Sequence, residues 1–238
     1  MNNKLKQEQI FKNLEAKMTS YRDLISIPVR ENGEPLSILK PRDNLMLFNT
    51  ILEDDLPKFT KTSKIIVRKT VVKKLEAVAE TLNRQRPNHN LSVVYGYRSL
   101  QTQKNIYEKF KKEFSKKYTE DELEERIHKY IANPSVAGHP TGGAIDVVLS
   151  DTNGTNLDFG SPLWVFTKQA YVFNPFVSVK AWNNRMFLRK LMLEQNFAPF
   201  DGEWWHFSYG DREWAYYYKK PEAIFRQITT TRILHDGS

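Results

Sequence analysis

Two short segments of the chain each join a histidine to a carboxylate at a spacing that could do chemistry. In GHPTGGAID, His139 lies in a glycine-rich loop and Asp146 follows seven residues later, inside a predicted strand. A carboxylate between two β-branched residues is costly to bury unless it is paired, hydrogen-bonded or bound to a metal. Gly142 and Gly143 would let the loop fold back so that His139 meets Asp146 over one ion. The alternative is that Asp146 caps a local turn and His139 is exposed.

The second segment is GEWWHF, in which Glu203 and His206 are three residues apart. Side chains three apart on a regular strand point to opposite faces, so both reach one site only if the strand bends or bulges after Gly202. Alternatively, Glu203 belongs to the preceding loop and only His206 lies on the strand. A third interpretation is an aromatic core strand whose histidine is merely hydrogen-bonded.

Together the two segments predict a metal centre. The chain has no cysteine, so any metal must be held by histidine and carboxylate. His139, Asp146 and His206 supply the three protein ligands of a catalytic zinc site, in which a fourth position stays open. Glu203 could then accept a proton from a water whose pKa the ion lowers. We therefore predict one Zn²⁺ per chain. The remaining histidines are weaker candidates. His89 lies in a polar turn, His128 on a charged helix and His235 in the C-terminal tail.

The composition allows a folded enzyme and excludes few other classes of protein. With 238 residues and 40% hydrophobic content, the chain can bury a core. No apolar run approaches the roughly 20 residues of a membrane-spanning helix, and the polar N-terminus does not look like a secretory signal. We expect a cytoplasmic protein, or a periplasmic one if a signal has been removed. The net charge of +8 could favour a polyanion, but basic and acidic residues alternate as on solvated helix faces, so we expect no nucleic-acid partner.

Hydrophobic periodicity predicts the helices that must support these residues. Apolar residues three and four apart, or runs of strong helix formers, predict helices over 67–82, 100–131 and 181–195. The middle range should divide in two, with Thr119 as the cap of its second helix. Residues 1–20 have helical composition, and the prolines and glycine of 21–41 predict an irregular, partly extended arm.

β-branched and aromatic runs predict strands over 91–97, 144–151 and 203–209. Arg98 follows the first of these strands directly. With no internal repeat or low-complexity linker, we expect one compact α+β domain over residues 61–238. Residues 1–60 are then a helical and irregular extension packed on that domain.

The motifs, taken in order, resemble those of a known family. His-x6-Asp in a small-residue loop is followed by Glu-x-x-His after a helix, with Tyr-Arg-Ser upstream. This pattern resembles the D-alanyl-D-alanine dipeptidases of vancomycin resistance, within the zinc D,D-peptidase family that includes D,D-carboxypeptidases. The matching segments are GYRS, GHPTGGAIDV, LDFGSP, NNRMFLRKLMLEQNF and EWWHF. The resemblance implies a central, mainly antiparallel sheet flanked by helices.

The resemblance also implies roles for single residues. His139, Asp146 and His206 match the family's zinc ligands, Glu203 its catalytic base, and Arg98 the arginine that stabilises the tetrahedral intermediate. An arginine at a strand's end can donate to a developing oxyanion; the alternative for Arg98 is a surface salt bridge. The residues that we expect near the substrate are Tyr97, Ala137, Trp164 and Trp205.

Two departures from the family pattern bear on the substrate. Ala137 stands where the dipeptidases usually have serine, and Trp164 stands where they carry the aspartate thought to hold the dipeptide's ammonium group. Asp158 or Asp151 could substitute for that aspartate. We expect a zinc peptidase that cleaves D-Ala-D-Ala or a similar dipeptide. The alternatives are a D,D-carboxypeptidase or endopeptidase acting on longer peptidoglycan stem peptides, and a non-catalytic module that binds cell-wall peptide. The oligomeric state is not predicted.

Overall fold

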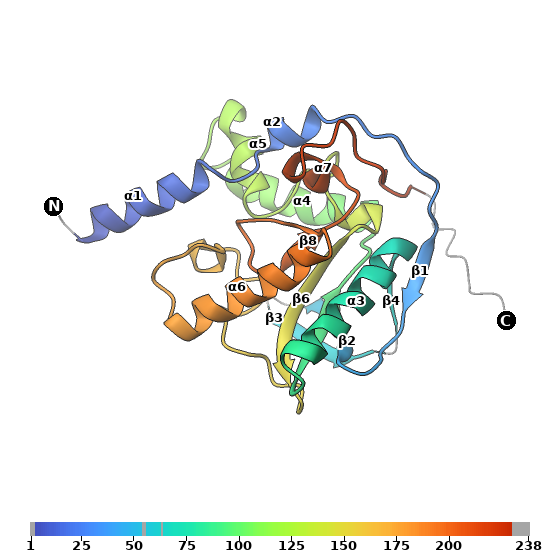
Figure 1. Cartoon of the computed structure of the whole chain (residues 1–238). Helices are drawn as coiled ribbons and strands as arrows, with labels where there is room; N and C mark the ends of the chain where they lie inside the picture. The colour runs from blue at the N-terminus through green and yellow to red at the C-terminus, as the bar shows by residue number, and fades with distance from the viewer. Residues whose placement is uncertain (1–2, 54–55, 63, 230–238) are drawn as a thin grey trace.

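The centre of the protein is a six-stranded sheet, seen in a computed structural model that describes residues 3–53, 56–62 and 64–229 (Figure 1). The strand order is β3-β2-β5-β6-β8-β7, and each neighbouring pair is antiparallel except β2 with β5. The strands are β2 (Leu45–Glu53), β3 (Leu56–Lys61), β5 (His89–Tyr95), β6 (Ala144–Asp151), β7 (Ala198–Pro199) and β8 (His206–Ser208). The predicted α+β fold with a central, mainly antiparallel sheet is confirmed.

Strand β6 lies in the middle of this sheet, between β5 and β8, and spans the predicted range of 144–151. All its residues except Asp151 are buried, as its run of apolar residues requires. The other predicted strands are right in place but wrong in extent. Strand β5 ends at Tyr95, and β8 begins only at His206 because residues 203–206 form a hydrogen-bonded turn.

Helices α3 (Lys69–Gln85) and α6 (Val179–Glu194) lie side by side over one face of the sheet (Figure 1). The buried side of α3 carries most of the apolar residues whose spacing predicted it: Val71, Leu75, Val78, Ala79 and Leu82. The predicted start at residue 67 is wrong, because Val67 belongs to the strand that precedes the helix. Helices α4 (Leu100–Phe114) and α5 (Glu120–His128) pack together near one end of the sheet. Thr119 is the N-cap residue of α5, as predicted, although its side chain accepts no hydrogen bond from the helix backbone.

The N-terminal part of the chain is more regular than predicted. Helix α1 (Asn3–Glu15) buries no residue and projects from the body (Figure 1). The arm predicted to be irregular contains helix α2 (Tyr21–Ile25), which begins at a capping box formed by Ser20 and Asp23, and strand β1 (Leu36–Leu39), which pairs with β4 (Ile65–Arg68). A five-residue helix is too short to show helical periodicity, so the sequence pattern missed it.

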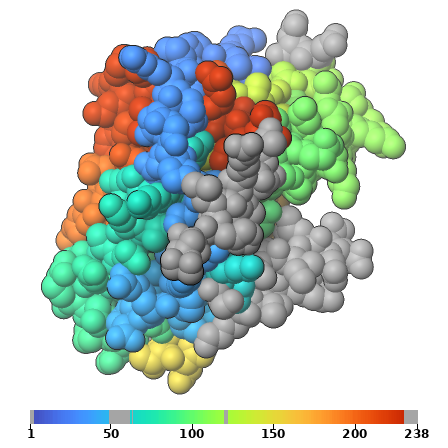
Figure 2. Space-filling view, turned by 90° about the vertical axis from the view of Figure 1, so that its right-hand side faces the viewer, coloured from blue at the N-terminus to red at the C-terminus, as the bar shows by residue number. Residues whose placement is uncertain are grey.

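Between α2 and β1 the chain runs beside residues 223–226, within the neighbouring blue and red segments of Figure 2. The backbone N–H of Arg30 donates to the carbonyl of Ala223 at 2.9 Å. The division of the chain at residue 60 stays a prediction, and β2, from the N-terminal side of that point, is a strand of the central sheet. No helix within the described residues combines the length and hydrophobicity needed to cross a bilayer.

Candidate metal centre and active site

Strand pairing places Asp146 directly opposite His206. The register between β6 and β8 pairs these two residues across the sheet, and paired side chains on one face start about 5 Å apart. Nδ1 of His206 lies 3.0 Å from Oδ1 of Asp146. A carboxylate in the middle of a buried sheet therefore has a partner, supplied by a residue 60 positions later in the chain.

His139 reaches the same carboxylate from a loop. It begins a short 3₁₀ helix, η1 (His139–Thr141), which ends at Gly142 with φ of 74°. That left-handed conformation suits glycine, and the loop folds back as predicted, so that Nε2 of His139 lies 3.5 Å from Oδ1 of Asp146. The alternative of an exposed His139 is wrong, because only 7% of the residue is accessible.

The hydrogen bonds of the two imidazoles fit a metal ion. Nδ1 of His139 lies 2.8 Å from the carbonyl oxygen of Gly96, which can only accept, so this nitrogen carries the proton. Nε2 of His206 lies 3.3 Å from Oε2 of Glu213, where it can donate in the same way. In both rings the other nitrogen faces Asp146 and can offer its lone pair to a cation.

The three donor groups, His139, Asp146 and His206, lie within 4.8 Å of one another and could hold a metal ion. Burial would raise the pKa of Asp146, but the two imidazoles beside it hold that pKa well below its usual range. Burial lowers the pKa of His139, which favours the neutral ring that a metal requires. For His206, hydrogen bonds to Asp146 and Glu213 outweigh burial and raise the pKa. The donor set of two imidazoles and one carboxylate is typical of catalytic zinc.

Glu203 lies in the turn that leads into β8, so the second alternative for GEWWHF is right. Its backbone N–H donates to Phe200, and its carbonyl accepts from the N–H of His206 at 3.2 Å. This turn brings its carboxylate within 4.0 Å of Nδ1 of His206, so both side chains reach one site without a strand bulge. Burial raises the pKa of Glu203 to about 8.

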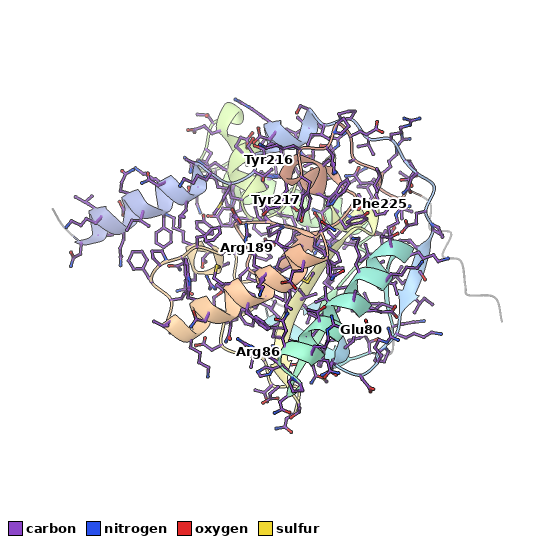
Figure 3. All side chains as sticks on the ribbon, viewed as in Figure 1. Glu80, Arg86, Arg189, Tyr216, Tyr217 and Phe225 are labelled. Carbon is purple, nitrogen blue, oxygen red and sulfur yellow. The ribbon has the colours of Figure 1, made fainter. Side chains whose placement is uncertain are left out.

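Two contacts hold this turn in place. The ring of Trp204 stacks on Phe159 with centroids 4.0 Å apart, and its indole N–H donates to Oγ of Ser161 at 3.0 Å. On the other side, Arg189 of α6, labelled in Figure 3, donates to Asp201 at 2.7 Å. The position of Glu203 is therefore fixed by side chains from two separate segments.

Arg98 lies three residues beyond β5 and is 8% accessible. Its Nε donates to the hydroxyl of Tyr95 at 3.2 Å and its Nη1 to Oε1 of Gln103 at 2.9 Å. No ion pair of Arg98 is present among the described residues, so the alternative of a surface salt bridge is not supported. The two hydrogen bonds hold the guanidinium in place on the wall of a cavity that the predicted catalytic residues also line.

These groups line one cavity of about 640 Å³, a volume that includes space open to solvent. Its polar wall carries Arg98, His139, Asp146, Glu203, His206 and Glu213. Its apolar wall includes Leu24, Ile131, Val136, Phe166 and Phe200. Of the residues predicted near the substrate, Ala137 and Trp164 line this cavity.

Tyr97 and Trp205 do not line this cavity, so the geometry does not support their predicted contact with substrate. Trp205 is fully buried in the core because it precedes His206 and points to the other side of the chain. Asp158 and Asp151 are also absent from the cavity wall. Their carboxylates accept backbone N–H groups of nearby turns instead, at Gly160 and at Asn153.

Glu213, Gln103 and His128 line the cavity but were not predicted as site residues. Glu213 contacts His206, Gln103 holds Arg98, and His128 is buried at the end of α5 on the cavity wall. The charged helix around His128 makes it a weak candidate in the sequence, and His235 lies outside the described residues. Nothing in the local sequence separates Glu213 from an ordinary acidic residue in a helix's first turn, here that of α7 (Arg212–Tyr217).

Comparison with known proteins identifies the family of this chain. A model of the peptidase M15 family, described as D-ala-D-ala dipeptidase, matches residues 49–226. The chain belongs to this family. Arg98, the three metal-binding candidates and Glu203 all lie within the matched range. The D,D-peptidase family makes the protein a hydrolase of the metallopeptidase class, and the resemblance noted in the sequence is confirmed.

Two curated relatives similar to this chain are named D-alanyl-D-alanine dipeptidases. The D-alanyl-D-alanine dipeptidase of Synechocystis sp. is 24% identical over 237 residues, which cover 88% of this chain and 96% of the relative. The D-alanyl-D-alanine dipeptidase of Escherichia coli is 32% identical over 81 residues, or 34% of this chain and 42% of the relative.

Among solved structures, a mutant of the vancomycin resistance D,D-pentapeptidase VanY in complex with Zn(II) matches with a TM-score of 0.43 and 13% identity. That match covers 85% of this chain and 95% of the VanY chain.

Proposed function

We propose that this D,D-peptidase hydrolyses D-Ala-D-Ala or a similar dipeptide with one zinc ion per chain. Nε2 of His139, Oδ1 of Asp146 and Nδ1 of His206 would hold the ion. When bound, zinc supplies a Lewis acid that polarises the scissile carbonyl and lowers the pKa of water. The observation that carries the proposal is the meeting of this donor set with a further carboxylate, Glu203, and a guanidinium, Arg98, on the wall of one cavity.

Glu203 is the general base in this mechanism. Its carboxylate takes a proton from the attacking water, whose oxygen adds to the carbonyl carbon. When the carbon–nitrogen bond breaks, Glu203 returns the proton to the leaving amine. The base must stand beside the reacting water, and the turn at 203–206 keeps its carboxylate 4.0 Å from Nδ1 of His206, next to the predicted ligands.

Arg98 stabilises the negative charge that develops on the carbonyl oxygen. Two of its nitrogens, Nε and Nη1, are occupied by Tyr95 and Gln103. Its Nη2 has no hydrogen-bond partner among the residues that the structure describes, and it remains available to an oxyanion in the cavity. A donor oriented in advance costs no reorganisation when the charge forms.

A second candidate substrate is a longer peptidoglycan stem peptide. The carboxylates on the cavity wall, Asp146, Glu203 and Glu213, lie beside the imidazoles, and Trp164 stands near them. None of these carboxylates is set apart to receive a free ammonium group. A substrate whose corresponding nitrogen is acylated would avoid burying an unpaired charge there.

The decisive experiment measures zinc content together with amine release. Free D-Ala-D-Ala, N-acetyl-D-Ala-D-Ala and a stem pentapeptide are compared for the wild type and for His206→Ala. About one zinc per chain with turnover of the free dipeptide, both lost in the variant, supports the dipeptidase. Turnover of only the acylated substrates supports the longer peptide. Zinc binding without turnover of any of the three supports a binding module and contradicts the enzyme mechanism.

A further inference from the structure

Trp164 contacts the carboxylate at the centre of the metal site. Its indole Nε1 donates to Oδ2 of Asp146 at 3.0 Å. The other oxygen, Oδ1, faces the two imidazoles, 3.0 Å from His206 and 3.5 Å from His139. The two oxygens of Asp146 therefore have separate partners, one on the indole side and one on the histidine side.

The backbone at Trp164 is held in an uncommon conformation that directs the indole. Its φ is 56°, in the left-handed region that bulky residues rarely adopt. Such a conformation persists when the surrounding structure imposes it, and it often occurs at functional sites. Here it turns a large side chain from the loop after β6 back towards a residue of β6.

The loop that carries Trp164 is anchored on the turn at 203–206. Phe159 stacks on Trp204, and Oγ of Ser161 accepts from the indole of Trp204. Leu163, just before Trp164, is 5% accessible and belongs to the main core. The same loop therefore contacts the neighbour of Glu203 at one point and Asp146 at another.

We propose that Trp164 is a positioning residue for Asp146, and this inference rests on the proposed zinc site. A carboxylate with both oxygens available can rotate, or can bind a metal through either oxygen or both. The indole N–H holds Oδ2 and leaves Oδ1 as the ligand atom, aligned with both histidines. Partners of this kind fix the orientation of metal ligands, and their removal typically costs 10- to 100-fold in metal affinity.

Trp164→Phe tests the inference because it keeps an aromatic ring and removes only the N–H. The matched control is Trp182→Phe, on α6, where the ring lies near Phe173 and does not line the cavity. Zinc affinity is measured by competition with a chelator. Ligand geometry is read from the visible absorption of the cobalt-substituted protein. Thermal unfolding of the metal-free proteins compares their folded states.

We expect Trp164→Phe to bind zinc about 10- to 100-fold more weakly than wild type and to change the cobalt spectrum, with the control unchanged. Wild-type zinc affinity and an unchanged spectrum in Trp164→Phe would overturn the inference and leave the proposed function intact. A wild-type protein that binds no zinc would overturn both. If the variant does not fold, NMR of the ¹⁵N-labelled wild type tests the inference instead. We expect the indole N–H resonance of Trp164 to shift when zinc is added. A resonance that does not shift would overturn the inference.

Discussion

Nε2 of His206 lies 3.3 Å from Oε2 of Glu213, while Nδ1 of the same ring faces Asp146. Glu213 belongs to the first turn of α7, which begins at the N-cap Asp211. The imidazole is thus held from one side by a helix and from the other by the central sheet. This arrangement selects the tautomer that offers Nδ1 to a metal.

Replacing Glu213 should weaken metal binding without removing a ligand. Glu213→Gln keeps the size of the side chain and one accepting oxygen, but it removes the negative charge that strengthens the hydrogen bond from Nε2 of His206. We therefore expect zinc affinity to fall about 10-fold or more. Competition with a chelator measures the change. Glu222→Gln, at an exposed ion pair with Arg30, is the control and should bind zinc like the wild type. Equal affinities for all three proteins would contradict the role of Glu213.

Replacing Glu203 should separate zinc binding from catalysis. Glu203→Gln removes the proton acceptor and keeps the three metal-binding residues, so we expect normal zinc content and a loss of about 10²- to 10⁴-fold in kcat. Elemental analysis and amine release on the same samples measure the two quantities. Glu194→Gln, on the outer part of α6 beside Lys190, is the control. Normal turnover by zinc-loaded Glu203→Gln would show that another group is the base.

Gly142 should be intolerant of a side chain for two reasons that a control can separate. Its φ is 74°, and an added Cβ would lie 2.5 Å from Cδ2 of Leu36. Gly33 has a similar φ of 77° but open space around an added Cβ. We expect Gly33→Ala to lose about 1–2 kcal/mol of unfolding free energy from the left-handed backbone alone.

Gly142→Ala should lose more than that and should also weaken zinc binding, because the loop carries His139. Urea unfolding measures the free energies, and chelator competition measures zinc affinity. Equal losses of stability in the two variants, with wild-type zinc affinity in both, would contradict this role of Gly142.

Asp211 should make stability depend on pH. Burial, and then the nearby Glu213, raise the pKa of Asp211 to about 6 in the folded protein from an ordinary value of 3.8. A raised pKa means that the folded state favours the protonated form, so this contribution is fully present below pH 3.8 and is lost as pH rises through about 6. It amounts to roughly 3 kcal/mol, since each pKa unit is about 1.4 kcal/mol.

Asp211→Asn removes this titration and keeps an oxygen that can accept from Trp214 N–H and the Ser208 hydroxyl, as Oδ1 does now. We expect the stability of the variant relative to wild type to increase between pH 4 and pH 7. Urea unfolding of the metal-free proteins across that range measures the difference. A difference that stays constant with pH would refute the assignment.

The sequence by itself determined the residue types and the local elements of this site. The absence of cysteine limited the donors to imidazole and carboxylate, and the apolar run at 144–151 predicted β6 with Asp146 inside it. Helix α3 followed from the spacing of its apolar residues. These features are local, because periodicity and side-chain chemistry act over a few neighbouring residues.

Only the tertiary structure decided which of these residues meet. The register of β6 with β8 places His206 opposite Asp146, and a shift by one residue would turn the histidine to the other face of the sheet. Glu213 and Trp164 reach the site through a helix start and a loop that no local pattern identifies as functional. Their contacts join residues far apart in the chain, and the packing of the whole core sets them.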